Sequence, residues 1–277
     1  MTRKIALTLL PLLVLAACST QRGGGYYQND GPPKRPRVDS SAIADAVPQA
    51  EPRSPYGNDP YIALGKTYYP LSEASGYRER GIASWYGKKF HGRRTSSGER
   101  YDMYTMTAAH KTLPLPTYVR VKNLRNGRAA IVRVNDRGPF LHNRLIDLSY
   151  AAAVKLDIVK AGTGLVEVEA LDPLGQSTGS NRNSIATTSA VEFSAVDGKR
   201  ARLYLQMGAF TNRENAVGLR SRLQDADFGP VLIQSEVRDN VRFYRVRVGP
   251  IASVEESDRL VRRAIKHGVS DAHIVIE

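Results

Sequence analysis

The chain has 277 residues, of which 42% are hydrophobic, and it carries a formal charge of +13. This length and composition suffice for two modest globular domains with tails. Cys18 is the single cysteine, which excludes a disulfide within the chain, so stability must come from packed cores. A strongly basic balance is typical of proteins that meet an acidic polymer or surface, with solubility alone as the plain alternative.

The first 17 residues have the pattern of an export signal. Arg3 and Lys4 precede an apolar run over residues 5–14, and small residues stand directly before Cys18. The run is shorter than the roughly 20 residues that span a bilayer, so we expect residues 1–17 to be removed. Because an exported protein does not ordinarily meet nucleic acid, cell-wall glycan or anionic lipid is the expected acidic partner.

The residues around Cys18 resemble the bacterial lipobox, in which the cysteine is acylated and becomes the mature N-terminus. The resemblance implies a lipid anchor on Cys18, since two or three acyl chains hold a protein durably on a membrane. Ser19 stands where an aspartate commonly retains lipoproteins in the inner membrane. The expected location is therefore the periplasmic face of the outer membrane. An ordinary signal peptide with a chance cysteine is the alternative.

Two segments of polar composition divide the rest of the chain. Residues 18–74 are rich in Gly, Pro, Ser, Arg and Asp and predict a lipidated, flexible tether, with residues 61–71 able to dock on the domain that follows. Residues 173–198 are rich in Ser, Thr, Asn and Gly and predict a second linker. The expected folded domains are therefore residues 75–172 and 199–277.

Residues 75–172 predict a compact β-barrel. Residues 118–122 and 130–134 alternate apolar and polar side chains, and the Asn126-Gly127 pair between them is a strong hairpin signal. Ser149 is placed to cap a short helix before the last strand, at residues 165–169. Many short strands joined by turns favour closure into a barrel.

Four patches in this domain, at residues 81–87, 95–99, 107–110 and 135–139, hold polar residues where a barrel needs none. Residues 81–170 closely resemble the double-psi β-barrel domain of the rare lipoprotein A family, most densely over residues 83–87, 107–114 and 134–139. The resemblance implies a six-stranded double-psi β-barrel with lytic transglycosylase (lyase) activity. Such an enzyme cleaves the β-1,4 bond between N-acetylmuramic acid and N-acetylglucosamine and leaves a 1,6-anhydro end. The family's catalytic residues carry over to Asp136 and His110, with Glu99 as a further active-site candidate.

The chemistry of these residue types agrees with the resemblance. Glycosidic cleavage needs a proton on the leaving oxygen, and when the sugar's own O6 is the nucleophile one carboxyl can act first as acid and then as base. We assign that role to Asp136, with His110 to tune it and Glu99 to raise a neighbouring pKa or orient the sugar. The alternatives are a turn aspartate, a structural histidine and a solvated loop glutamate, respectively.

Three more residues are secondary candidates. Asp147 resembles the aspartate that related double-psi barrels place beside their active site, or it caps the helix near Ser149. Trp85 and Tyr86 could stack on a sugar, although alternation sends them to opposite faces and favours core packing for one. No ligand spacing supports a metal site built from residues such as His91, and we expect no metal and no cofactor.

Residues 199–277 carry an internal repeat at an offset of 41 residues, in which residues 205–210 align with residues 246–251. Each half predicts strand, helix and strand, giving a ferredoxin-like βαββαβ fold with a four-stranded antiparallel sheet and two helices on one face. The repeat resembles the SPOR domain, which implies binding of glycan strands that lack stem peptides. Gln206, Phe210 and Tyr244 are the candidate glycan-binding residues, or ordinary strand residues.

Together the two resemblances imply an endolytic transglycosylase that processes denuded glycan strands at the division septum during daughter-cell separation. The expected partners are glycan strands, the membrane through the lipid anchor and divisome proteins, but not nucleic acid. The main alternative is a non-catalytic, glycan-binding septal scaffold. A hydrolase that uses water in place of O6 is a third possibility, which the chemistry of the product ends would separate.

Overall fold

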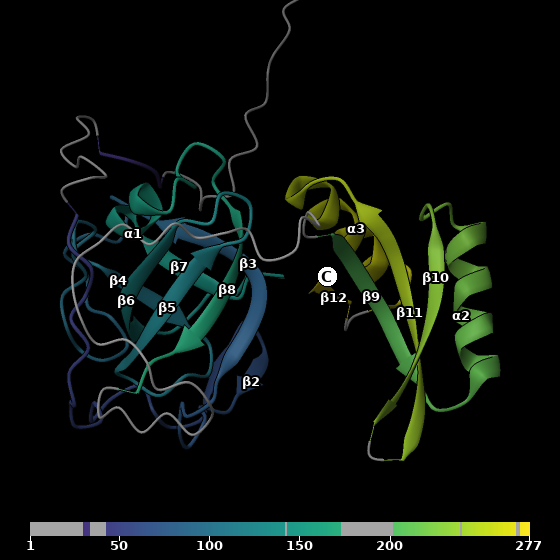
Figure 1. Cartoon of the computed structure of the whole chain (residues 1–277), viewed down its shortest axis with the longest axis horizontal. Helices are drawn as coiled ribbons and strands as arrows, with labels where there is room; N and C mark the ends of the chain where they lie inside the picture. Colours follow the sequence, from purple (N-terminus) through teal and green to yellow (C-terminus); the bar gives the residue numbers. More distant parts are fainter. Residues whose placement is uncertain (1–29, 34–42, 142, 173–201, 239, 270–271) are drawn as a thin grey trace, which may run out of the picture.

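The computed structural model describes residues 30–33, 43–141, 143–172, 202–238, 240–269 and 272–277 (Figure 1). The expected export signal, Cys18 and the linker at residues 173–198 lie outside these ranges and stay predictions. Within the described ranges, no helix combines the length and apolar character needed to cross a membrane.

The first domain is a closed six-stranded barrel, which confirms the predicted fold class (Figure 1). Its strands follow one another around the barrel in the order β3-β7-β4-β6-β5-β8. Strands β3 and β7 pair in parallel, as do β4 and β6, and the other pairs are antiparallel. The elements are β3 (Arg78–Tyr86), β4 (Thr107–His110), β5 (Thr117–Asn123), β6 (Ala129–Asp136), β7 (Ile146–Ser149), α1 (Tyr150–Lys155) and β8 (Gly164–Ala170).

Alternation of side chains explains how the barrel closes around its core. Val119 and Val121 of β5 are fully buried, while Arg120 between them faces solvent, as a strand with one buried face requires. Gly127 has a φ of 74° in the turn between β5 and β6, a conformation that costs glycine little. The predicted hairpin is therefore present. Ser149 caps α1 by accepting a hydrogen bond from the Ala152 N–H at 3.2 Å.

Part of the expected flexible tether differs from the prediction, because residues 43–74 pack on the barrel. We call residues 43–59 the strap. The strap's Ala46 N–H donates to the Ile131 carbonyl at 3.1 Å, and its Ser54 N–H donates to the Leu115 carbonyl at 2.9 Å. After the strap come β1 (Tyr61–Ala63) and β2 (Lys66–Tyr68), an antiparallel hairpin. The prediction that residues 61–71 dock on the barrel agrees with this placement.

The second domain has the predicted βαββαβ order (Figure 1). Its sheet runs β10-β11-β9-β12 and is antiparallel throughout. Both helices bury side chains in the one apolar cluster that also holds alternate residues of the sheet, so both cover the same face. The elements are β9 (Leu203–Phe210), α2 (Arg213–Asp225), β10 (Val231–Arg238), β11 (Val241–Ile251), α3 (Val254–Lys266) and β12 (His273–Ile276).

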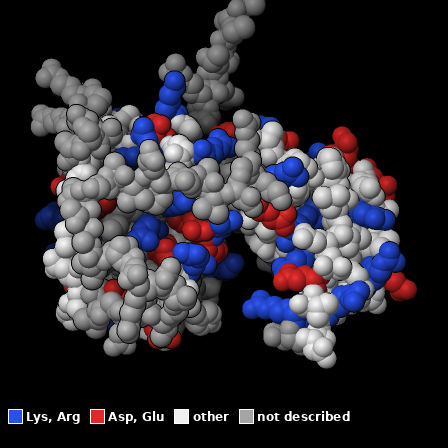
Figure 2. Space-filling model, in the orientation of Figure 1, with Lys and Arg blue, Asp and Glu red and all other residues white. Residues whose placement is uncertain are grey.

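The two domains meet where the edge strand β12 lies beside β3 (Figure 1). Ile82 and Leu165 of the barrel belong to the same buried apolar cluster as Leu203 and Ile276 of the second domain. Covering β12 in this way shields an edge that would otherwise expose unpaired backbone groups. Figure 2 shows a gap between the domains in the lower half of the view, with acidic and basic side chains interspersed over both of them.

Candidate functional site

Asp136 lies at the end of β6, and hydrogen bonds to one of its two oxygens orient its carboxyl group. Its Oδ1 accepts hydrogen bonds from the Ser96 N–H at 2.8 Å, the Ser96 hydroxyl at 2.7 Å and the Arg137 N–H at 2.8 Å. In the described part of the chain, no hydrogen bond reaches Oδ2. Burial raises the pKa of Asp136, although the three donors oppose that rise. The carboxyl is thus oriented and has one oxygen available for proton exchange.

Asp147 is a second carboxyl with a raised pKa. It lies on β7, partly buried, and accepts a hydrogen bond from the Ser84 hydroxyl. Burial raises the pKa of Asp147 to about 6, and the charge of Asp136 contributes to the rise. Arg144 and Lys111 act in the opposite direction. A carboxyl of this kind changes its protonation close to neutral pH.

The two carboxyls flank one residue of the barrel, Ala109. In β4, Ala109 pairs with Asp136 of β6 on one side and with Asp147 of β7 on the other. Directly paired residues point to the same face of a sheet, and two strand spacings separate their backbones by roughly 10 Å. The loop after Asp136 crosses near Asp147, since a Cβ on Gly138 would lie 4.0 Å from Asp147 Oδ2.

His110 is buried with 2% of its surface exposed, and its ring is fixed at both nitrogens. Nδ1 accepts from the backbone N–H groups of Thr112 at 3.2 Å and Leu113 at 3.0 Å, so Nε2 carries the proton and donates to the Tyr77 hydroxyl at 3.0 Å. That hydroxyl donates to Glu79 at 2.8 Å. Burial lowers the pKa of His110 to about 3, so the imidazole is neutral at physiological pH.

The predicted tuning of Asp136 by His110 is not direct. In the described part of the chain, no hydrogen bond joins the His110 ring to Asp136. The link runs through Arg137, whose guanidinium donates to the His110 carbonyl at 3.1 Å and to the Leu113 carbonyl at 2.6 Å. The same guanidinium donates to the Gly57 carbonyl of the strap at 2.7 Å. The strap therefore helps to hold the residue that follows Asp136.

Glu99 is exposed, and its carboxylate is held by other side chains. Both of its oxygens accept from Arg133 Nη1 at 2.8 Å, and Oε2 also accepts from the Asn135 amide at 2.8 Å. Arg133 in turn pairs with Glu51 of the strap at 2.6 Å. Glu99 therefore lies beside the residue that precedes Asp136, within an ion-pair cluster that anchors the strap.

Trp85 and Tyr86 are both core residues, which corrects their assignment as sugar-stacking candidates. They are 3% and 6% exposed. Trp85 packs on Tyr150 of α1, with ring centroids 5.7 Å apart, and Tyr86 stacks on Tyr101 at 4.1 Å. Alternation does send the two rings to opposite sides of β3, but α1 covers one side and residues 87–106 cover the other.

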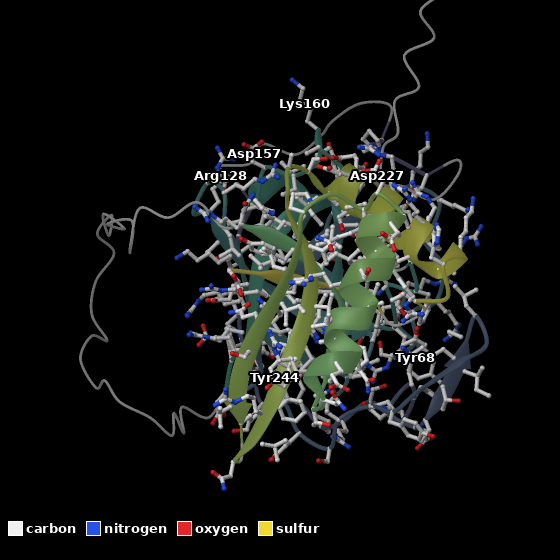
Figure 3. The ribbon with its side chains drawn as sticks, turned by 90° about the vertical axis from the view of Figure 1, so that its right-hand side faces the viewer. Tyr68, Arg128, Asp157, Lys160, Asp227 and Tyr244 are labelled. Atoms are coloured by element: carbon white, nitrogen blue, oxygen red, sulfur yellow. The ribbon has the colours of Figure 1, made fainter. Side chains whose placement is uncertain are left out.

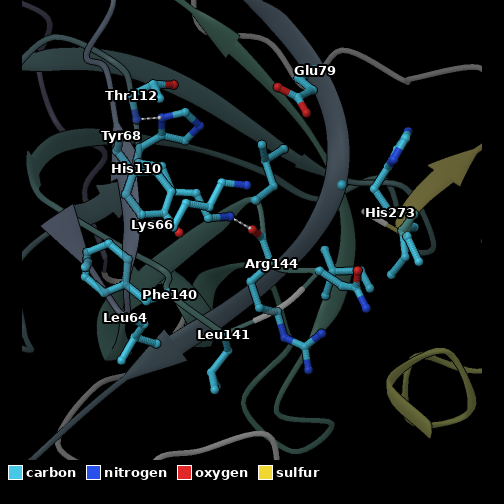
Figure 4. A pocket seen from close by; sticks show the side chains of 18 of the residues that line it. Leu64, Lys66, Tyr68, Glu79, His110, Thr112, Phe140, Leu141, Arg144 and His273 are labelled. Carbon is cyan, nitrogen blue, oxygen red and sulfur yellow. Dashed lines mark hydrogen bonds between the residues drawn. The ribbon is translucent and has the colours of Figure 1, made fainter. Parts of the chain in front are cut away.

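A pocket of about 770 Å³ opens beside His110, between the β1–β2 hairpin, the loop after β6 and the second domain (Figure 4). Ala272, His273 and Ile274 form its wall on the second domain. Figure 4 shows Tyr68 and Phe140 on one side of this pocket and His273 on the other. Because His110 lines the pocket, a ligand in it lies next to the carboxyl-bearing strands.

In the second domain the three predicted glycan-binding residues do not share a face. Phe210 and Tyr244 pair directly across β9 and β11 and pack against the helix-side core. Figure 3 shows Tyr244 toward one end of the sheet, away from Tyr68 of the barrel hairpin. Gln206 lies on the opposite face, buried, where it accepts from Arg245 at 3.3 Å. Arg247 lies near it and pairs with Glu277.

Sequence reasoning did not single out several residues that build the site. Ser96 and Ser84 hold the two carboxyls, Tyr77 holds His110, and Arg137 joins the strap to the strand ends. Ser84, Ser96 and Arg137 lie within the polar patches of the sequence, but no sequence pattern marks Tyr77. Over the described ranges, no three His, Cys, Asp or Glu side chains gather as metal ligands.

Comparison with known proteins supports the assignment of both domains. Residues 78–168 match the family described as lytic transglycolase, and residues 199–275 match the SPOR domain. A crystal structure of the RlpA SPOR domain from Pseudomonas aeruginosa is 37% identical and covers 26% of this chain and 96% of its own, with a TM-score of 0.26.

Relatives also match across both domains. The endolytic peptidoglycan transglycosylase RlpA of Pseudomonas aeruginosa is 44% identical over 265 residues, which cover 80% of this chain and 77% of that protein. The protein of the same name from Vibrio cholerae is 53% identical over 168 residues, which cover 61% of this chain and 64% of its own. The fold, the domain order and these relatives agree, and the chain belongs to the RlpA family.

Proposed function

We propose that this protein is an endolytic peptidoglycan transglycosylase. The observation that supports the proposal best is the pair of carboxyls, Asp136 and Asp147, on the strands either side of Ala109, both with raised pKa values. Glycosidic cleavage needs a proton donor at the leaving oxygen and stabilisation of a positively charged sugar. A raised carboxyl pKa favours the protonated form that a proton donor needs.

In the proposed reaction, Asp136 is the acid and then the base. Its protonated Oδ2 donates to the glycosidic oxygen as the bond from that oxygen to C1 of the N-acetylmuramic acid breaks. The O6 hydroxyl of the same sugar then attacks C1 and gives its proton back to Asp136. One bond breaks, one forms and no water is consumed, which leaves the 1,6-anhydro end. Asp147, when ionised, stabilises the positive charge at C1.

We assign positioning roles to the residues around the two carboxyls. His110 is neutral and fixed, so it shapes the wall of the pocket and bonds to Tyr77 rather than exchanging protons. Ser96 orients Asp136. Glu99 holds Arg133 and Asn135 beside Asp136. These contacts support a rigid site, which is what acid–base catalysis by one carboxyl needs.

The SPOR domain supplies the second half of the proposed function, the binding of glycan strands. On the sheet face opposite the helices, the partly exposed Arg245 lies beside the buried Gln206, and its guanidinium can meet sugar hydroxyls and carboxylates. We do not assign Phe210 and Tyr244 to this surface, because they pack on the helix side. Binding of strands that lack stem peptides, and enrichment at the septum with divisome partners, belong to this proposal.

The proposed location is the periplasmic face of the outer membrane, with Cys18 as the lipid anchor. The sequence pattern of residues 1–19 supports it. Because the strap packs on the barrel, the free length of tether is shorter than the whole segment 18–74. Residues 30 and 31 also bond to the barrel, because the Gly87 and Lys89 N–H groups donate to the Asp30 carboxylate and the Lys88 N–H donates to the Gly31 carbonyl. At about 3.3 Å per extended residue, residues 18–29 span roughly 40 Å.

Digestion of amidase-treated sacculi tests the function. The wild-type protein should release fragments with 1,6-anhydro ends, identified by mass spectrometry, and Asp136→Asn should release none while still binding glycan. Reducing ends would instead indicate a hydrolase that uses water. A wild-type protein that binds sacculi and yields no fragments would support the alternative, a non-catalytic glycan-binding scaffold.

A further inference from the structure

The pocket beside His110 has one apolar, aromatic wall. Tyr68 stacks on Tyr61 with ring centroids 5.2 Å apart, and Phe140 lies 5.7 Å from Tyr68. Leu64 and Leu141 at the rim are 81% and 42% exposed. Flat aromatic and apolar side chains at an open pocket suit the less polar face of a pyranose ring.

The charged side chains of the pocket leave an excess of positive charge. Four cations line it, but Arg80 pairs with Glu167 at 2.9 Å and Arg144 pairs with Asp258 at 2.7 Å. Among the described residues that line the pocket, Lys66 and Lys111 remain, against the carboxylate of Glu79. Lys66 forms no ion pair with any described residue, and its ammonium lies 5.9 Å from the centre of the Tyr68 ring.

The ammonium group of Lys111 can donate further hydrogen bonds. Its ammonium donates to the Arg144 carbonyl, and an ammonium group has three donors. Burial lowers the pKa of Lys111, and the nearby charges of Lys66 and Arg144 lower it further, while Asp147 and Glu79 raise it. An anion beside the Lys111 ammonium would oppose the burial and the positive charge of Lys66 that disfavour its charged form.

We propose that this pocket is a subsite for an N-acetylmuramic acid residue whose lactyl carboxylate is free, with Lys66 and Lys111 binding the carboxylate and Tyr68 and Phe140 packing on the sugar. The inference rests on the proposed function and names the substrate form that this pocket selects. In a strand that carries stem peptides, the same lactyl group is a neutral amide. Such a group cannot form charge-assisted hydrogen bonds with both ammonium groups. The pocket, whose wall includes His273 and Ile274 of β12, thus favours denuded glycan.

The test compares two soluble muramyl oligosaccharides, one with free lactyl carboxylates and one with the same groups as methylamides. With the full-length protein, kcat/KM should be about tenfold higher for the free acid, as expected for losing a charge-assisted hydrogen bond. Lys66→Gln should remove this preference by slowing cleavage of the acid alone. Lys66→Arg should keep it. Lys122→Gln, which removes an exposed cation of β5 outside the pocket, is the matched control.

An unchanged preference in Lys66→Gln would overturn the subsite. Failure of the wild-type protein to cleave either compound would overturn the proposed function instead. In that case calorimetric binding of the same two compounds still decides the subsite, because the SPOR contribution is common to the Lys66→Gln and Lys122→Gln proteins. Equal binding of acid and methylamide by the wild-type protein would exclude carboxylate recognition in the pocket.

Discussion

Arg144 of the barrel and Asp258 of α3 form a two-bond ion pair across the domain boundary, at 3.0 and 2.7 Å. The Arg144 side chain is 4% exposed and Asp258 is 24% exposed. A planar guanidinium fork on a carboxylate fixes orientation as well as distance. This ion pair and the apolar cluster around Ile82 and Leu165 fix the position of the SPOR domain beside the pocket.

Breaking this ion pair should loosen the two domains. Asp258→Ala leaves a nearly buried guanidinium without its partner, which we expect to weaken docking by roughly 3 kcal/mol. Small-angle scattering should then show a larger radius of gyration than for the wild-type protein. Arg78→Ala removes a pair with Glu169 in which Arg78 is 57% exposed, and should change nothing. An unchanged scattering profile in Asp258→Ala would show that the apolar cluster holds the domains by itself.

Asp147 should reduce stability at neutral pH. Its folded pKa of about 6 is above the unfolded value of 3.8, so its protonated form contributes stability below pH 3.8 that is lost as the pH rises through 6. Asp147→Asn should therefore raise the free energy of unfolding at pH 7 by about 3 kcal/mol, and have little effect near pH 4, by urea denaturation. Asp157→Asn, an exposed control, should have no such pH-dependent effect. A gain of equal size at both pH values would contradict the raised pKa.

The sequence predicts the strands and helices of both domains well, because the patterns that specify them span only a few neighbouring residues. The β5–β6 hairpin follows from alternation around Asn126-Gly127, and the SPOR fold follows from the repeat between residues 205–210 and 246–251. Both features depend on neighbours in sequence, since turn residues and strand periods act over a few positions.

The site was harder to predict, because its contacts join distant segments. Asp136 and His110 could be named from their motifs, but the partners that fix them, Ser96 and Tyr77, lie 40 and 33 residues away in sequence. The strap was expected to be flexible because its composition is polar. Its anchor is Glu51, paired with Arg133 across 82 residues, and composition carries no signal of such a pair.

The neutral state of His110 should appear in the acid stability of the protein. Its folded pKa of about 3 lies below the ordinary value of 6.5, so the unfolded chain binds the extra proton between these values and stability falls as the pH drops from 6.5 to 3. That loss is roughly 4 kcal/mol. His110→Gln should be less stable at pH 7, yet should lose less stability on acidification. Urea titrations from pH 7 to pH 3.5 measure both slopes. Parallel slopes would show that His110 is protonated in the folded state.

Ser96 should control the protonation of Asp136. Its hydroxyl hydrogen bond lowers the pKa of Asp136, so Ser96→Ala should raise that pKa and move the alkaline limb of kcat/KM to higher pH, because the acid stays protonated longer. The rate at the optimum should fall about tenfold as the carboxyl loses one of its orienting bonds. Thr105→Ala, an exposed loop control, should leave the profile unchanged. A lower rate with an unmoved alkaline limb would mean that Ser96 positions Asp136 without setting its pKa. Another group, of which Asp147 is the first candidate, would then supply the proton.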